Sequence, residues 1–256
     1  MKRLYSSFIP VAAAALMCTS CSTHYRLAGI ERSRILIDAR YDANPDEAAA
    51  EYLRPYTARV DSIMSPVVGR TAHYMAVSRL ESELSNLLSD ILIWASAKFN
   101  ETPDFAVYNV GGIRAALAEG KVTTGDIVDV APFENRICFV SLTGAQVREL
   151  FGQIAARGGE GLSHSVRIVA TSDRKLKSAT INGKPIDDSR TYRIATLDYL
   201  AQGNDGMEAF KHKTDMVAPE GEANNIRNFI CDYFREQQKE GKAVSSQVEG
   251  RMVIEK

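Results

Sequence analysis

The sequence predicts a mixed α+β domain in which helices flank a mixed β-sheet, and three observations lead to this class. Helical and extended segments alternate irregularly along the chain. An Asn182-Gly183 pair separates two extended runs and is the strongest hairpin signal in the sequence. The 256 residues, 45% hydrophobic and 25% charged, suit one large globular domain, or one domain with an arm.

Residues 1–21 have the features of a bacterial lipoprotein signal peptide. A basic "MKR" precedes the apolar run "LYSSFIPVAAAALM", which is too short and too alanine-rich for a membrane span. Cys21 follows two small residues, Thr19 and Ser20, so we expect its thiol to take the lipid after cleavage. Lipidation at Cys18, cleavage without lipidation, or an uncleaved anchor would also fit this stretch. The chain is thus expected to be exported and lipid-anchored in the cell envelope, in the periplasm or at the outer membrane.

A tether and a helical arm are predicted to follow the signal peptide. Residues 22–43 are polar and mixed, and residues 44–66 have the character of a helix. Asn44 suits the N-cap and Pro45 the first helical position, whereas Pro55 should kink or divide the helix. The helical spacing comes from four apolar residues: Leu53, Tyr56, Val60 and Met64.

The remaining residues, 67–256, are predicted to form the domain itself. Apolar residues recur at helical spacing in three stretches: 81–100, 143–159 and 222–238. Gly158 or Gly159 should close the second of these helices. Cys138 and Cys231 are expected to be buried free thiols, with a disulfide as the alternative. Extended runs are predicted at 103–109, 125–133, 135–144, 165–171, 176–186, 191–201 and 245–256.

The stretch "YNVGGIR" combines residue types that suit ligand binding. Gly111 and Gly112 allow the backbone to come close to a ligand. Arg114 offers a planar fork to a carboxylate or phosphate, or a face that stacks on a ring. Asn109 can both donate to and accept from the edge of a base. The alternative is a tight turn in which the glycines only relieve a steric problem.

Two more loops carry candidate site residues. Phe133 lies in "DVAPFENRICFV", a proline-containing loop between extended runs, and the alternative is a core phenylalanine. Tyr199 is predicted to end a strand, and the "GNDG" loop that follows contains Asp205. The alternative for Asp205 is a turn in which its side chain caps its own backbone.

Five motifs in order resemble the C-terminal domain of the bacterial and animal 5'-nucleotidases. They are "E-x-x-L-x-N-L-x-x-D", "N-x-G-G-I-R", "A-P-F-E-N", "L-T-G-x-Q-V-x-x-L-F" and "L-x-x-G-N-D-G". The resemblance runs from about Val67 to Lys256. Five motifs in the same order are more specific evidence than any single motif. The same family includes UDP-sugar hydrolases and 2',3'-cyclic-nucleotide phosphodiesterases.

The resemblance implies that this domain binds the nucleoside part of a nucleotide. Phe133 and Tyr199 match the two aromatic residues that sandwich the base, although the family usually has Phe at the second position. Asn109 and Arg114 match polar contacts to the base and to the ribose or phosphate. Asp205 matches the acid that holds the ribose hydroxyls, because a carboxylate accepts from two vicinal hydroxyls at once. Gly111 and Gly112 belong to the same motif as Asn109.

The sequence departs from the family pattern at several points. Arg79 lies near the position of a phosphate-binding arginine, but in a different register. Ser85 and Val110 stand where the family often has glycine. The stretch "RGGEGLSHS", residues 157–165, occupies the region of another substrate loop without a firm alignment.

The family's catalytic residues lie in a separate N-terminal metallophosphoesterase domain, and this sequence lacks its metal motifs. The histidines match no metal motif: His24, His73, His164 and His212. We therefore predict no catalytic residue, no metal ligand and no cofactor in this chain, with divalent metals on a partner domain. The formal net charge of −1 indicates no nucleic-acid partner, and the membrane is expected to be reached through the lipid anchor only.

Three functions follow from the resemblance. The first is the nucleoside- or nucleotide-binding half of a split 5'-nucleotidase that acts in nucleotide catabolism, with a separate metallophosphoesterase chain as partner. The second is a lipoprotein that binds nucleosides or nucleotides without catalysis. The third is a domain that keeps the fold and binds no ligand.

Overall fold

The computed structural model describes residues 25–255, so the predicted signal peptide with Cys18 and Cys21 lies outside the described residues. The chain divides between Tyr52 and Leu53, and the two parts are described separately. Between residues 25 and 255, no helix combines the length and the apolar character that crossing a membrane requires.

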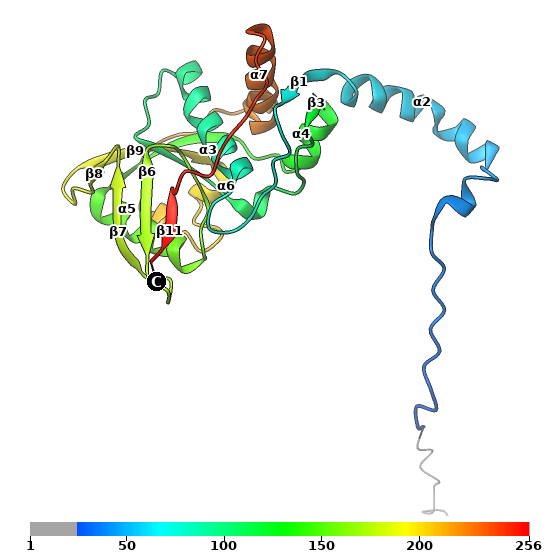
Figure 1. Ribbon diagram of the computed structural model, residues 1–256, viewed down its shortest axis with the longest axis horizontal. Helices are drawn as coiled ribbons and strands as arrows, with labels where there is room; N and C mark the ends of the chain where they lie inside the picture. Colours follow the sequence, from blue (N-terminus) through cyan, green and yellow to red (C-terminus); the bar gives the residue numbers. More distant parts are fainter. Residues whose placement is uncertain (1–24, 256) are drawn as a thin grey trace, which may run out of the picture. The chain divides into compact units, whose positions relative to one another are not determined.

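The first part of the described chain is extended and then helical (Figure 1). A 3₁₀ turn, η1 (Ala39–Tyr41), precedes α2 (Glu47–Met64). The prediction that Asn44 caps this helix is wrong, because Oδ1 of Asp46 accepts the backbone N–H of Ala49 at 3.0 Å and the helix begins at Glu47. The helix also continues through Pro55, which therefore does not divide it.

The second part of the chain is built on a five-stranded mixed sheet. The strands β2 and β9 are parallel, whereas β4 and β9, β10 and β4, and β2 and β5 are antiparallel. This confirms the predicted mixed sheet. In spatial order the strands are β10 (Thr214–Val217), β4 (Ile137–Thr143), β9 (Thr191–Leu197), β2 (Phe105–Tyr108) and β5 (Gly161–Leu162).

Two smaller sheets complete the β-structure of the described residues. The pair β1 (Val67–Thr71) and β3 (Gly120–Thr123) is antiparallel. Asn182 and Gly183, at φ 52° and 73°, form the β7–β8 turn, which confirms the predicted hairpin. In Figure 1, β6, β7 and β11 lie side by side. The four-stranded sheet has the order β11 (Met252–Ile254), β6 (Val166–Ala170), β7 (Leu176–Ile181) and β8 (Lys184–Pro185).

The three long helices predicted for the domain are confirmed. The side chain of Ser82 accepts the backbone N–H of Ser85 at the start of the first helix, and Thr143 forms a capping box with Gln146 at the start of the second. At the end of the second helix Gly158 and Gly159 have φ 83° and 103°, as a glycine C-cap requires. The helices are α3 (Glu83–Ser96), α5 (Gly144–Ala156) and α7 (Ile226–Lys239).

Two local predictions are wrong. The stretch predicted as extended at 125–133 contains the helix α4 (Thr124–Val130), which begins at a capping box between Thr123 and Asp126. Tyr199 lies in the short helix α6 (Asp198–Ala201) and does not end a strand. Four further 3₁₀ turns occur among the described residues: η2 (Ala97–Phe99), η3 (Val110–Gly112), η4 (Glu208–His212) and η5 (Glu222–Asn224).

The five-stranded sheet separates two hydrophobic cores. The helices α3 and α7 pack on one face, and α5 with the four-stranded sheet packs on the other. Cys231 belongs to the first core and Cys138 to the second. Both are buried free thiols, as predicted, and burial raises the pKa of Cys138 to about 12.

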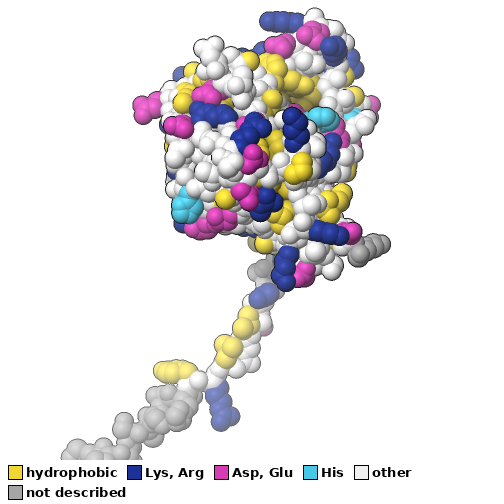
Figure 2. Space-filling model, turned by 90° about the vertical axis from the view of Figure 1, so that its left-hand side faces the viewer, with side chains coloured by type: hydrophobic (Ala, Val, Ile, Leu, Met, Phe, Trp, Pro, Cys, Tyr) yellow, Lys and Arg dark blue, Asp and Glu magenta, His cyan; other side chains and the backbone are white. Residues whose placement is uncertain are grey.

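The surface shown in Figure 2 carries charges of both signs. Lys and Arg side chains lie among Asp and Glu side chains, with hydrophobic side chains between them. This mixture agrees with the formal net charge of −1.

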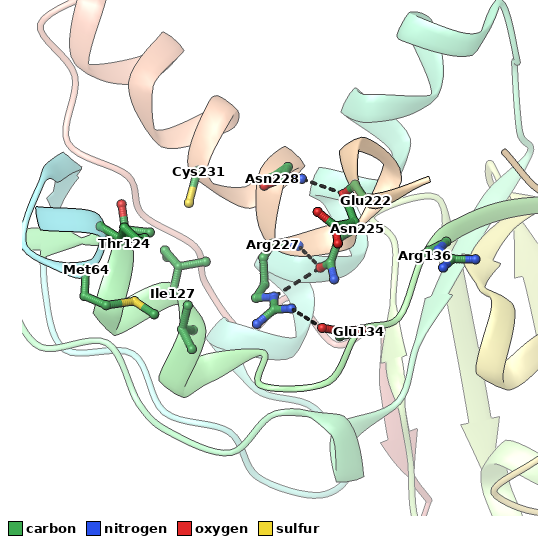
Figure 3. Close-up of a pocket in the computed structure, with 12 residues that line it drawn as sticks. Met64, Thr124, Ile127, Glu134, Arg136, Glu222, Asn225, Arg227, Asn228 and Cys231 are labelled. Atoms are coloured by element: carbon green, nitrogen blue, oxygen red, sulfur yellow. Dashed lines mark hydrogen bonds and ion pairs between the residues drawn. The ribbon is translucent and has the colours of Figure 1, made fainter. Parts of the chain in front are cut away.

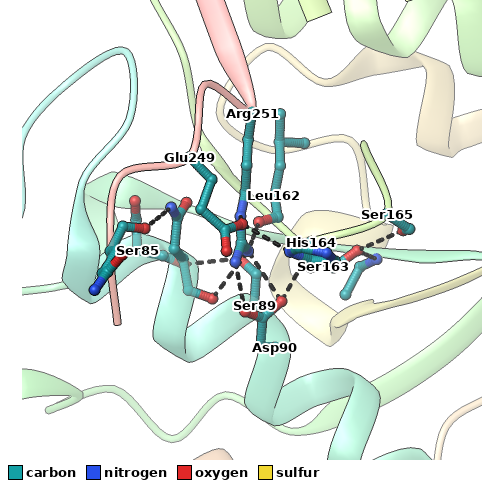
Figure 4. A network of polar contacts seen from close by, with 12 residues as sticks. Ser85, Ser89, Asp90, Leu162, Ser163, His164, Ser165, Glu249 and Arg251 are labelled. Atoms are coloured by element: carbon teal, nitrogen blue, oxygen red, sulfur yellow. Dashed lines mark hydrogen bonds and ion pairs between the residues drawn. The ribbon is translucent and has the colours of Figure 1, made fainter. Parts of the chain in front are cut away.

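A buried arginine directly before β11 links this strand to α3 and to β5 (Figure 4). The Arg251 side chain is 3% exposed and forms ion pairs with Asp90 at 2.6 Å and Glu249 at 2.9 Å. It also donates to the carbonyl of Leu162 at 2.6 Å. His164 lies 2.8 Å from the same Glu249 carboxylate. The partners are numerous enough to compensate for removing the guanidinium from water.

Glu249 should make the stability of this domain sensitive to acid. Partial burial raises the pKa of Glu249, but the hydrogen bonds from His164 and Arg251 outweigh it and lower the pKa below its ordinary 4.5. A carboxylate of this kind stabilises the fold above its unfolded-state pKa and loses that effect as the pH falls through the folded-state value. Glu249→Gln should therefore lower the free energy of unfolding by about 1 kcal/mol near neutral pH.

The difference between wild type and Glu249→Gln should shrink as the pH falls below the ordinary value of 4.5, as measured by urea unfolding over a series of pH values. The control is Glu255→Gln, which removes an exposed ion pair with Lys177 and should change stability by less than about 1 kcal/mol. If Glu249→Gln lowered the free energy of unfolding by the same amount in acid as at neutral pH, this account would be contradicted.

Candidate functional site

The sheet topology brings three loops to one edge. The strands β2 and β9 are parallel neighbours, so the loops that follow them leave the sheet at the same edge. The strand β4 is antiparallel to β9, with Ile137 opposite Leu197, so the loop that precedes β4 lies at that edge too. A pocket of about 200 Å³ forms where these loops meet. It is lined by Asn109, Gly111, Phe133, Asn135, Tyr199 and Asp205.

Five of the seven residues predicted for the site therefore line one pocket. The side chain of Phe133 is 48% exposed and that of Tyr199 is 38% exposed. Core aromatic residues are buried on nearly all sides, whereas about half of Phe133 is exposed, so Phe133 is not a core residue. Two accessible rings on one small pocket can provide stacking surfaces for a flat ligand.

Asp205 presents its carboxylate to this pocket, and its partners come from other segments. Oδ2 accepts Nδ2 of Asn109 at 3.0 Å, and Oδ1 accepts the hydroxyl of Tyr199 at 3.4 Å. Nη2 of Arg157 lies 3.7 Å from Oδ1. These contacts show that the Asp205 side chain does more than cap its own turn. The negative charge of Asp205 raises the pKa of Tyr199, with smaller contributions from desolvation and the hydrogen bond.

Gly112 leaves the space that the side chain of Asn109 occupies. This side chain is buried, and Oδ1 has no hydrogen-bond partner among residues 25–255. A Cβ atom at position 112 would lie 2.7 Å from that Oδ1, so only glycine leaves room for the Asn109 side chain. Gly112 thus supports the pocket without lining it. A buried acceptor without a partner has an energetic cost.

Arg114 is not brought into the pocket. Its side chain is exposed, and Nη1 donates to the carbonyl of Gly111 at 3.3 Å. It lies on the same turn as Asn109 and Gly111, but the pocket wall does not include it.

A buried glutamate that the sequence reasoning missed organises the loops around this pocket. Glu160 is 2% exposed. Its Oε2 accepts the backbone N–H of Val110 at 2.6 Å, and its Oε1 accepts Nη1 of Arg79 at 2.6 Å and Nε of Arg157 at 3.0 Å. Asn135 was missed as well, although it is the last residue of the "A-P-F-E-N" motif. The sequence could have indicated Glu160, because it is a charged residue between two glycines, Gly159 and Gly161, in the loop-like stretch 157–165.

A second cavity, of about 310 Å³, lies beside α4 and the start of α7 (Figure 3). Its walls include Ile127, Arg227 and Cys231, and Figure 3 shows Arg227 paired with Asn225 and Glu134. None of the predicted site residues lines it. The chain at 133–136 contributes alternate residues to the two cavities, with Glu134 and Arg136 on this side.

Metal-ligating side chains do not gather in the part of the chain that is described. Across residues 25–255, no group of three or more His, Cys, Asp or Glu side chains is placed to hold a metal ion. His164 contacts Glu249, and His73 lies 3.4 Å from Glu83.

Comparisons with known proteins agree with the geometry. The family described as "5'-nucleotidase, C-terminal domain" matches residues 67–212. A cell wall protein of Listeria monocytogenes is 30% identical over 193 residues, which cover 70% of this chain and 24% of that protein. The trifunctional nucleotide phosphoesterase YfkN of Bacillus subtilis is 28% identical over 236 residues, covering 84% of this chain and 16% of that protein.

A solved structure shares the fold. The 5'-nucleotidase precursor of Thermus thermophilus aligns with a TM-score of 0.67 at 23% identity, over 83% of this chain and 44% of that one. This chain spans a quarter or less of the length of the two curated relatives above. The match to residues 67–212 covers more than half of the 256 residues. This chain therefore belongs to the family described as the C-terminal domain of 5'-nucleotidases.

Proposed function

We propose that this chain is the nucleoside- or nucleotide-binding half of a split 5'-nucleotidase in the cell envelope. Such an enzyme hydrolyses the phosphomonoester of a nucleotide, and its dimetal catalytic half would be a separate metallophosphoesterase chain. The observation that carries the proposal is the small pocket with two exposed aromatic rings and the Asp205 carboxylate.

The pocket suits the base and ribose of a nucleoside. Its volume of about 200 Å³ lies below the range of about 300–1,000 Å³ for drug-sized ligands, so it would hold a base better than a whole nucleotide. Base stacking on Phe133 and Tyr199 would supply affinity. Asp205, whose carboxylate lines the pocket, could accept from ribose hydroxyls.

Two arginines on the surrounding loops could meet the phosphate. Arg114 is exposed on the turn that carries Asn109, and the Arg79 side chain is 46% exposed and tied to the same turn through Glu160. Guanidinium groups suit phosphate because their donors form a planar fork. These are proposed contacts at the mouth of the pocket, since neither arginine lines it.

The metal chemistry is assigned to the partner. In two-metal sites the ions stabilise the attacking and leaving oxygens of phosphoryl transfer. The described residues here offer no such donor set, and in the proposed arrangement the partner chain would hold both ions. Its own residues bind the substrate and orient it, which lowers the entropic part of the barrier.

Replacing the two aromatic residues should abolish nucleoside binding. Stacking contributes about 1–3 kcal/mol per base, so Phe133→Ala and Tyr199→Ala should each weaken adenosine binding measurably in isothermal titration calorimetry. The double variant should show no binding, whereas Tyr199→Phe should retain most of the affinity. The control is Tyr74→Ala, which removes an exposed ring that does not line the pocket. Unchanged affinity in the double variant would reject the site.

The purified chain should not hydrolyse AMP with added divalent metal. Mixing it with a separately expressed metallophosphoesterase chain should restore hydrolysis, and the two should co-purify. Phosphate release and size-exclusion chromatography would measure these outcomes. Hydrolysis by this chain alone would refute the split arrangement. Adenosine binding by a chain that binds no metallophosphoesterase would favour the non-catalytic lipoprotein.

We also propose that the chain is exported and anchored through a lipid on Cys21. Metabolic labelling with a fatty-acid analogue should label the wild type and Cys18→Ala but not Cys21→Ala. The matched pair of cysteine variants separates the two lipid sites. Label retained by Cys21→Ala but lost from Cys18→Ala would move the anchor to Cys18, and an unlabelled wild type would reject lipidation.

A further inference from the structure

A tight turn after α5 lies behind the pocket, and the proposed function gives it no role. This RGGE turn, residues Arg157–Glu160, reverses the chain through two left-handed glycines. A Cβ atom on Gly159 would lie 2.4 Å from the carbonyl oxygen of Leu80, so a side chain cannot be accommodated there. The backbone N–H of Leu80 donates to the carbonyl of Gly158 at 2.7 Å. The turn is therefore fixed against the chain that precedes α3.

The turn places one guanidinium between two carboxylates. Nε of Arg157 donates to Oε1 of Glu160 at 3.0 Å, and Nη2 lies 3.7 Å from Oδ1 of Asp205. The Arg157 side chain is 30% exposed, whereas the Glu160 side chain is fully buried. A planar fork with separated donors can reach both acids at once, which a lysine ammonium cannot do from one position.

We propose that Arg157 is a positioning residue that holds Asp205 for recognition of the two vicinal hydroxyls of a ribonucleoside. This inference rests on the proposed function, in which the pocket binds a nucleoside. Asp205 lies at φ 53°, in the left-handed region, in a loop with Gly203 and Gly206. Contacts from Asn109, Tyr199 and Arg157 hold its carboxylate.

Those contacts act on both oxygens of Asp205. Asn109 donates to Oδ2, and Arg157 approaches Oδ1 from the RGGE turn. A Cβ atom on Gly206 would lie 3.6 Å from Nη1 of Arg157, so the guanidinium packs closely against the Asp205 loop. The Tyr199 hydroxyl is the second hydrogen-bond donor, at 3.4 Å from Oδ1, but it belongs to a ring that would also stack on the base.

Glu160 makes this arrangement rigid. Its carboxylate fixes Arg157 and also accepts the N–H of Val110, on the turn that carries Asn109. The hydrogen-bond donor Asn109 and the ion-pair partner Arg157 are thereby both linked to one buried carboxylate. Because the carboxylate is held before the ligand arrives, less conformational freedom is lost on binding. The site should therefore discriminate ribose from deoxyribose.

The test compares the affinities of adenosine, 2'-deoxyadenosine and 3'-deoxyadenosine for the full chain by calorimetry. Wild type should prefer adenosine by about tenfold or more, the effect of one hydrogen bond to a charged acceptor. Arg157→Gln should bring this ratio close to one, while the affinity for the deoxynucleosides changes by less than about threefold. Arg157→Lys, which keeps the charge without the fork, should give an intermediate ratio.

The matched control is Arg148→Gln, which removes an arginine of the preceding helix α5 that pairs with Asp188 away from the pocket. It should leave both affinities and their ratio unchanged. Equal loss for all three ligands in Arg157→Gln would indicate a merely structural role and overturn the inference. An unchanged ratio in Arg157→Gln, or equal affinities in wild type, would overturn it as well. If Arg157→Gln does not fold, Arg157→Lys and the wild-type ratio decide.

Failure of this inference can be told from failure of the proposed function. If wild type binds none of the three nucleosides, the nucleoside pocket itself is rejected. If wild type binds adenosine through Phe133 and Tyr199 but the ratio does not depend on Arg157, only the positioning role is rejected.

Discussion

The arrangement of the site loops depends on the hydrogen bonds that the buried carboxylate of Glu160 accepts. A buried charge is tolerated only when it is paired and hydrogen-bonded, and this one has a backbone N–H and two guanidinium groups as donors. The donors come from the chain before α3, the turn after β2 and the end of α5. Removing the carboxylate would leave three segments without their common acceptor, so its effect would reach well beyond one contact.

The sheet determines where the site can form, and the loops determine what it can bind. Because β2 and β9 run parallel and β4 runs against them, residues distant in sequence meet at one edge. The two cores on either face fix these strands from both sides. The strands thus provide a rigid support, while the chemistry lies in loops that could change without disturbing the cores.

Much of the fold could be predicted from local signals, and the failures have physical reasons. The helical spacing of apolar residues in α3 and the Asn182-Gly183 turn depend only on residues close together in the sequence, so they can be read from it directly. The helix α4 was missed because "DIVDV" alternates like a strand, whereas the capping box at Thr123 decides its conformation. Five pocket residues could be found through ordered motifs. Arg157 and Glu160 could not, because their importance depends on which distant loops folding brings to them.

The separation of the two cores also bears on the redox chemistry of the domain. Cys138 and Cys231 lie on opposite faces of the central sheet, and the strands between them prevent the approach that an S–S bond requires. Burial raises the pKa of both thiols, so little thiolate forms at neutral pH to attack an oxidant or a second thiol. An oxidising compartment would therefore leave Cys138 and Cys231 without a cross-link between them, and the stability of the domain of residues 67–255 would not depend on oxidation of these two thiols.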